Sequence, residues 1–181
     1  MNDSLFPSRL GLALVGYRGT GKSTVGRLLA GRLGRPFVDA DLALEARTGR
    51  TIRSVFEGLG EQAFRDREEA LLAELTAEPF KVLATGGGVV LRESNRKALR
   101  RFGFVVWLCA DPRVLSRRLQ TDPGAVAGRP ALTSAGTLGE IADVLASREA
   151  LYREVADAVL DTDGRTPAEI VEAVLDLLPK C

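Results

Sequence analysis

Near the start of the chain, a glycine-rich loop has the residue types and spacing of a phosphate-binding site. Residues 16–24 read GYRGTGKST and fit the pattern G-x-x-x-x-G-K-[ST] throughout. Glycines allow the tight turn in which consecutive backbone N–H groups point at an anion. In this pattern Lys22 contacts the β- and γ-phosphates, and the hydroxyl of Ser23 ligates Mg²⁺. The loop therefore predicts a nucleoside triphosphate site with Mg²⁺, formed by Gly19, Thr20, Gly21, Lys22, Ser23 and Thr24.

Two aspartates, Asp39 and Asp41, follow the second short apolar run of the chain. Ligands of a parallel sheet gather at the carboxyl ends of its strands, so we expect both carboxylates beside the loop. The alternation of a strand would make them face the same way. One would support the Mg²⁺ water shell while the other reaches a second substrate. Asp39 is the predicted metal ligand, through water, because the third apolar run ends in glycines rather than in the usual aspartate. Capping of the helix at Leu42 is the alternative role of Asp41.

Three glycines and several arginines are candidates for a second binding site. Gly86, Gly87 and Gly88 follow the third run and allow close approach of a ligand to free N–H groups, although a flexible turn is the alternative. Arg65 borders the apolar stripe of a predicted helix, where a carboxylate three or four residues away, Glu68 or Glu69, can hold its guanidinium. Spacing alone does not distinguish Arg65, Arg129 and Arg148 from surface charges.

Composition limits the class of protein. The 181 residues are 45% hydrophobic and predict one compact α/β domain over 1–181. With 25 basic and 24 acidic residues, the net charge of +1 argues against a general nucleic-acid or membrane-surface partner. No apolar run has transmembrane length, no signal peptide is recognisable, and the two cysteines have no metal or redox spacing. We expect a cytoplasmic protein. Because there is no histidine, proton transfer must use a carboxylate, lysine, tyrosine or water.

Five short apolar runs predict strands, and helical patterns between them predict a parallel sheet with helices on both faces. The runs are 10–15, 36–39, 81–84, 104–108 and 158–161. Two connections are too long for simple crossovers. Helical segments at 42–47, 52–56 and 63–75 make 40–80 a predicted substrate-binding region. An irregular segment rich in Gly, Pro, Ala and Ser makes 118–137 a predicted lid.

Taken together and in order, these motifs resemble the shikimate kinases over nearly the full chain. They are GYRGTGKST, FVDADLALE, GEQAFRDREE, TGGGVV, GRPAL, REALYREVAD and DTDGRTPAEIV. The resemblance implies the three-layer P-loop NTPase fold with strand order 2-3-1-4-5. It implies ATP-dependent phosphorylation of the 3-hydroxyl of shikimate, giving 3-phosphoshikimate and ADP, in aromatic amino-acid biosynthesis. A monomer with only small-molecule partners, shikimate and ATP, is expected.

The resemblance also implies roles for individual residues. Asp41, Arg65, Arg148 and the glycines around Gly87 match shikimate-binding positions, with the two arginines gripping the carboxylate. Bidentate bonding by planar guanidinium groups suits that ligand. Asp41 would orient the attacking hydroxyl and accept its proton, with Lys22 and Arg129 supplying positive charge. Ser23 and Asp39 match the Mg²⁺ positions. The residues that match phosphate or adenine contacts are Arg118, Arg129, Arg165 and Pro167.

Three other functions fit parts of the pattern. Another small-metabolite kinase of this fold, such as a gluconate kinase, or a nucleoside monophosphate kinase would share the phosphate loop. The aspartate pair with the three glycines argues instead for a hydroxylated carboxylate as acceptor. A catalytically silent relative should lack Lys22, Asp41 or an arginine of the grip, and all are present. One departure is Ala131, in Arg-Pro-Ala-Leu, where the family usually has Arg-Pro-Leu-Leu.

Overall fold

A single five-stranded parallel sheet forms the centre of the molecule. The computed structural model describes residues 7, 10–121 and 138–179. Its strands follow the predicted order β2-β3-β1-β4-β5. The central strand β1 pairs with β3 on one side and β4 on the other, and β5 pairs with β4. The strands are β1 (Gly11–Val15), β2 (Phe37–Asp39), β3 (Val82–Ala84), β4 (Gly103–Cys109) and β5 (Ala158–Asp161).

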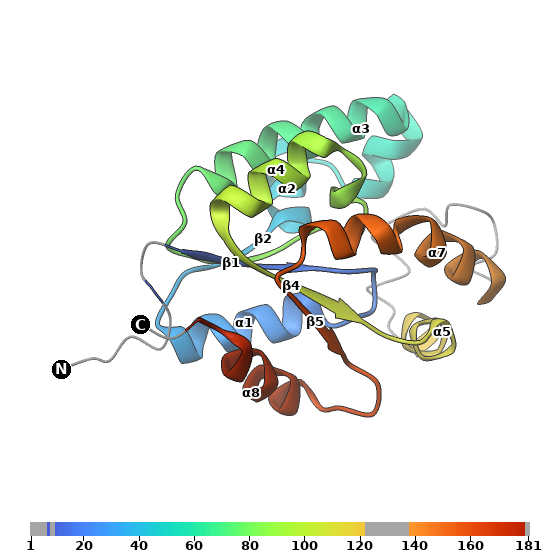
Figure 1. The fold of residues 1–181 in the computed structure, drawn as a ribbon. Coiled ribbons are helices and arrows are strands. Elements are labelled where there is room, and N and C mark those ends of the chain that lie inside the picture. Colours follow the sequence, from blue (N-terminus) through green and yellow to red (C-terminus); the bar gives the residue numbers. More distant parts are fainter. Residues whose placement is uncertain (1–6, 8–9, 122–137, 180–181) are drawn as a thin grey trace.

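Helices cover both faces of the sheet, as the alternating pattern predicts (Figure 1). The helices are α1 (Lys22–Leu33), α2 (Ala40–Thr48), α3 (Ile52–Thr76), α4 (Glu93–Phe102), α5 (Pro112–Thr121), α7 (Leu138–Val155) and α8 (Pro167–Leu177), with the 3₁₀ turn η1 (Val89–Leu91). Leu12 and Leu14 of β1 pack with α1 and α8, whereas Ala13 and Val15 pack with α3, α4 and α7. This alternation makes a three-layer domain with a core on each face of the sheet.

The segment after β2 turns into a helix earlier than predicted. α2 begins at Ala40, not at Leu42, because Asp39 caps it. The carboxylate Oδ1 of Asp39 accepts hydrogen bonds from the N–H groups of Asp41, at 3.0 Å, and Leu42, at 3.3 Å. Asp41 therefore lies in the first turn of α2. The predicted strand alternation does not apply to the pair, because Asp41 is not in a strand. Asp39, rather than Asp41, provides the helix cap.

The two helical segments predicted at 52–56 and 63–75 are one kinked element, α3. Gly60 interrupts it with φ 80° and ψ 169°, a conformation outside the helical region that favours glycine. Beyond the kink, the predicted apolar stripe is buried at Phe64, Leu71 and Leu72. Phe64 and Leu71 share a small core with Leu44 of α2. The kink therefore joins two arms that both pack on α2.

Part of the predicted lid lies outside the described residues. α5 extends to Thr121 and α7 begins at Leu138. Residues 122–137, Arg129 among them, are not described. Leu115 and Leu119 of α5 pack with Ile141 of α7 and Tyr17 of the phosphate loop, which places α5 beside that loop. None of the helices in the described ranges is long and apolar enough to cross a membrane.

Candidate active site

The predicted phosphate loop connects β1 to α1 as the motif requires. α1 begins at Lys22, directly after Gly21, whose φ of 90° lies in the left-handed region. The Lys22 ammonium donates to the carbonyl of Tyr17 at 2.7 Å, and the Thr20 hydroxyl donates to the same carbonyl at 2.8 Å. These contacts curl the loop around the start of the helix, where N–H groups and the helix dipole favour an anion.

A cavity of about 600 Å³ opens at the carboxyl end of the sheet. Its lining includes residues from three separate sequence motifs. From the phosphate loop it includes Lys22 and Ser23, from the aspartate pair both Asp39 and Asp41, and from the glycine turn Gly87. Other lining residues are Arg18, Gly19, Gly21, Thr24, Arg27, Leu42, Glu45, Ile52, Thr85, Arg118, Leu119 and Thr121. The aspartates and the loop are therefore neighbours, as expected from their places at strand ends.

The two predicted Mg²⁺ residues are in direct contact. The Ser23 hydroxyl donates to Oδ2 of Asp39 at 2.5 Å, while Oδ1 of the same carboxylate caps α2. Hydroxyl and carboxylate oxygens are the hard ligands that Mg²⁺ prefers. Among the described residues no group of three or more His, Cys, Asp or Glu side chains could hold a metal. A Mg²⁺ bound mainly by phosphates and water needs no such group, so the residues present fit the ion.

Arg65 lies against the glycine turn that follows β3. Its side chain is buried, its Nη1 donates to Glu68 at 2.6 Å, and its Nη2 donates to Glu61 at 3.2 Å. A Cβ on Gly88 would lie 2.4 Å from Nη1 of Arg65, so any larger residue there would have to displace the guanidinium. Glu68 thus holds the guanidinium, as predicted for one of the two candidate carboxylates. The other, Glu69, bonds to Arg92 instead.

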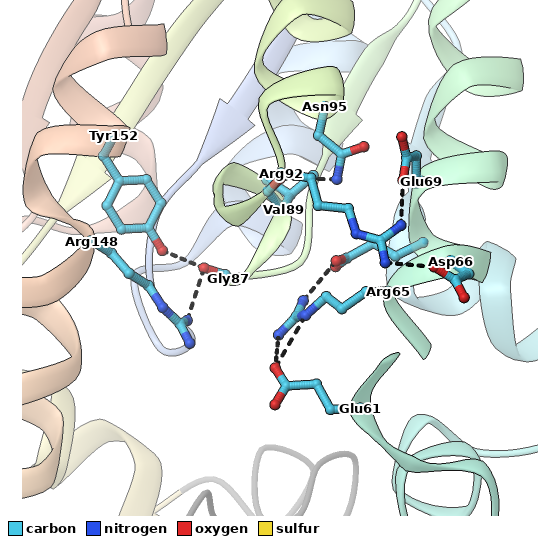
Figure 2. A network of polar contacts seen from close by, with 11 residues as sticks. Glu61, Arg65, Asp66, Glu69, Gly87, Val89, Arg92, Asn95, Arg148 and Tyr152 are labelled. Atoms are coloured by element: carbon cyan, nitrogen blue, oxygen red, sulfur yellow. Dashed lines mark hydrogen bonds and ion pairs between the residues drawn. The ribbon is translucent and has the colours of Figure 1, made fainter. Parts of the chain in front are cut away.

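Arg148 reaches the same turn from the opposite side. The buried arginine, on α7, donates from Nη1 to the carbonyl of Gly87 at 3.2 Å. Figure 2 shows Arg148 and Arg65 approaching the turn from different helices. The turn also touches the phosphate loop, because a Cβ on Gly87 would lie 3.4 Å from the backbone nitrogen of Arg18. Four of the predicted substrate-binding residues are not among those that line the cavity. They are Gly86 and Gly88 within the turn, and Arg65 and Arg148 beside it.

Of the predicted adenine contacts, the structure brings one to the cavity. Arg118 lines it and donates to the carbonyl of Gly19 at 3.3 Å and to that of Thr162 at 2.8 Å. This side chain joins the phosphate loop to the segment after β5. Arg165 and Pro167 lie in and after that segment, at the start of α8, and do not line the cavity.

Three residues near the site had no assigned role in the sequence analysis. Arg18 lines the cavity, but it occupies a variable position of the loop motif. Tyr152 donates its hydroxyl to Gly87 at 2.5 Å, and its spacing of four from Arg148 on a helix is the signal that could have found it. Arg92 pairs with Asp66, at 2.5 Å, and with Glu69. Hydrogen bonds from Ser94 and Arg92 lower the pKa of Glu69.

Comparisons with known proteins agree on one family. The sequence profile of the family described as Shikimate kinase matches residues 18–179. The shikimate kinase of Rhodopirellula baltica is 44% identical over 178 residues, covering 98% of this chain and 94% of its own. That of Pseudomonas fluorescens is 48% identical over 167 residues, covering 92% and 95%.

Solved structures extend the similarity to the fold. The shikimate kinase from Acinetobacter baumannii, solved in complex with shikimate, superposes with a TM-score of 0.88 at 39% identity, covering 94% of this chain and 93% of its own. A gluconokinase from Sinorhizobium meliloti superposes with a TM-score of 0.60 at 21% identity, over 94% of this chain and 91% of its own. The second likeness shows a shared fold alone.

Proposed function

The chain belongs to the shikimate kinase family, and from that premise we propose that it transfers the γ-phosphoryl group of ATP to the 3-hydroxyl of shikimate. The products are 3-phosphoshikimate and ADP. The observation that carries the proposal is the position of the glycine turn. Gly87 lies against the phosphate loop and accepts a hydrogen bond from Arg148, while Gly88 lies against Arg65. An anion-binding loop and two arginines therefore meet at one turn.

On the donor side, the phosphate loop and the start of α1 would bind the phosphates of ATP. Lys22 would place its charge on the β- and γ-phosphates. Mg²⁺, when bound, neutralises developing charge on the phosphates, and Ser23 with Asp39 would hold it, Asp39 through water. We assign Arg118 to the adenine side because it lines the cavity next to the loop. Arg165, Pro167 and the undescribed Arg129 complete the proposed nucleotide site.

On the acceptor side, Arg65 and Arg148 would bind the carboxylate of shikimate, and the N–H of Gly87 would donate to it or to a hydroxyl. Asp41 lines the cavity beside the loop, where it would orient the 3-hydroxyl and take its proton. The hydroxyl oxygen then forms the new O–P bond as the bond from the γ-phosphorus to the bridging oxygen of ADP breaks. With no histidine in the chain, a carboxylate is the suitable base.

The same proposal extends to the setting of the reaction. We propose Mg²⁺ as the metal, a monomeric enzyme, no nucleic-acid partner, and a cytoplasmic place in aromatic amino-acid biosynthesis. A near-neutral charge of +1 supports a small-molecule kinase over a nucleic-acid binder.

A coupled assay of ADP release tests the proposed activity. The purified chain with ATP and Mg²⁺ should release ADP at a rate that saturates with shikimate, but not with gluconate or a nucleoside monophosphate. Turnover with either of the latter and none with shikimate would refute the assignment. Shikimate binding in a calorimeter without any turnover would identify a catalytically silent relative.

A further inference from the structure

A tyrosine on α7 is tied to the glycine turn by its hydroxyl. The Tyr152 ring has no exposed surface and stacks on Trp107 of β4, with ring centroids 5.4 Å apart. Its hydroxyl donates to the carbonyl of Gly87 at 2.5 Å. The two residues are 65 positions apart in the sequence, so this bond links the last helix before β5 to the loop after β3.

Arg148 shares the acceptor of this bond. Arg148 and Tyr152 are four residues apart on α7 and therefore lie on the same face of the helix. Both donate to the carbonyl oxygen of Gly87, which has two lone pairs and can accept both bonds. Figure 2 shows the phenol and the guanidinium converging on this one oxygen.

The peptide between Gly87 and Gly88 connects the two arginines. Because a peptide unit is planar, the direction of the Gly87 carbonyl also determines where the α-carbon of Gly88 lies. That α-carbon is packed against the guanidinium of Arg65. Glycines have little conformational preference of their own, so the orientation of this peptide must come from its contacts.

We propose that the Tyr152 hydroxyl is a positioning group for the acceptor substrate. It holds the Gly87–Gly88 peptide, and through it sets Arg148 at the carbonyl and Arg65 at the α-carbon of Gly88. Tyr152 itself does not line the cavity and acts only through the turn. This inference rests on the proposed function, in which the turn and the two arginines bind shikimate.

The effect of the hydroxyl can be separated from that of the ring. Tyr152→Phe keeps the stacking on Trp107 and removes one hydrogen bond to the turn. We expect the Kd and KM for shikimate to rise roughly fivefold to tenfold, the size of one lost hydrogen bond. The KM and Kd for ATP should stay at the wild-type values, because the phosphate loop keeps its contacts.

Phe102→Leu is the matched control for loss of core packing. Phe102 is buried in the same core cluster, but its ring lies over Gly11, at the amino-terminal end of β1 and away from the turn. This variant should lower the Tm and leave the shikimate Kd unchanged. A structural role for Tyr152 would give the same result in Tyr152→Phe.

Calorimetric titration of the full chain with shikimate and, separately, with ATP tests the positioning role of Tyr152. A selective loss of shikimate affinity in Tyr152→Phe supports the positioning role. Unchanged shikimate affinity in this variant, or equal losses of affinity for shikimate and ATP, would overturn the positioning role. The proposed function would still stand in that case, provided that the wild-type chain phosphorylates shikimate. Failure of the wild type to bind shikimate would overturn both.

Discussion

Arg65 illustrates how tightly single residues are constrained at this site. Its guanidinium bonds to Glu61 and Glu68, lies 5.1 Å from the centroid of the Phe64 ring, and packs on Gly88. Burying an arginine requires that its charge be paired, and the buried Glu68 meets that requirement. Glu61 is more than half exposed. It can yield its hydrogen bonds to a substrate carboxylate, which makes Glu61 the contact that we expect to change on binding.

Gly88→Ala tests the contact between the turn and Arg65. The backbone of Gly88, with φ −101°, accepts alanine, so the fold should tolerate the change. The new methyl group would lie 2.4 Å from the present Nη1 of Arg65 and must displace the guanidinium. We expect the KM for shikimate to rise about tenfold, as for one charge-assisted hydrogen bond, and the KM for ATP to stay constant. Unchanged shikimate kinetics would remove Arg65 from the acceptor site.

Asp41→Asn tests the proposed proton acceptor. The amide keeps the size of the side chain but cannot take a proton at pH 7. We expect kcat to fall by about 10²- to 10⁴-fold, the usual contribution of a general base, with ATP affinity retained. Steady-state rates and nucleotide titration measure the two effects. A variant with wild-type kcat would assign both orientation and proton transfer to another group.

Among the helices, α3 has a kink that separates two arms, both packed on α2, with Arg65 on the second arm. Gly60 has a backbone conformation that is essentially restricted to glycine, with φ 80° and ψ 169°. Gly60→Ala should therefore lower the free energy of unfolding by about 1–3 kcal/mol.

Gly58→Ala is the control for that substitution, because Gly58 is helical and a Cβ there meets no atom within 4 Å. It should be neutral or stabilising by about 0.5–1 kcal/mol. Urea denaturation of both variants measures the difference. Equal stabilities would mean that the kink is not strained by a side chain.

Strand positions were predictable because short apolar runs bounded by polar residues are typical of buried strands in an α/β chain. The predicted strand 158–161 coincides with β5, three others begin one residue later than predicted, and β4 is one residue longer than predicted at each end. Helix boundaries were less predictable because they depend on particular contacts. α2 starts early since Asp39 turns to cap it, which leaves no periodic signal. The break predicted between 52–56 and 63–75 is present as the non-helical kink at Gly60, although the helical arms reach closer to it than predicted.

At the scale of the whole molecule, the two halves of the site differ in how far the sequence reveals them. The phosphate loop is local, so its motif predicted its position between β1 and α1. The glycine turn depends on α3 and α7, and the bond from Arg148 to Gly87 spans 61 residues. Sequence spacing could not predict that meeting. The family resemblance indicated Arg65, Gly87 and Arg148 as a set, whereas the bond from Tyr152 to Gly87 and the ion pairs of Arg92 are visible only in the folded chain.

The pH dependence of the folding stability depends on the titratable groups of the whole molecule. There is no histidine to titrate near neutrality, and hydrogen bonds from Ser94 and Arg92 lower the pKa of Glu69 in the folded state. A lowered carboxyl pKa stabilises the fold above the unfolded value of about 4.3, and this stability is lost as pH falls through the folded pKa.

Glu69→Gln should therefore be less stable than wild type at pH 7, by no more than about 1 kcal/mol for a partly exposed pair. The gap should narrow as the pH falls below the unfolded value of about 4.3 and close below the lowered pKa of folded Glu69, where the wild-type carboxylate is also protonated. Glu78→Gln is the control, because the Glu78 side chain is 88% exposed and lies 3.8 Å from Lys81. Denaturation curves at several pH values test this, and a gap that persists in acid would contradict it.

We infer that the phosphate loop and the glycine turn together direct one phosphoryl group to one hydroxyl. Proton and phosphorus NMR of the products from ATP and shikimate tests it most directly. We expect one phosphate ester, coupled to the proton at C3 of shikimate, in equal amount to ADP. ADP formed without phosphorylated shikimate, or phosphate found on another hydroxyl, would contradict it.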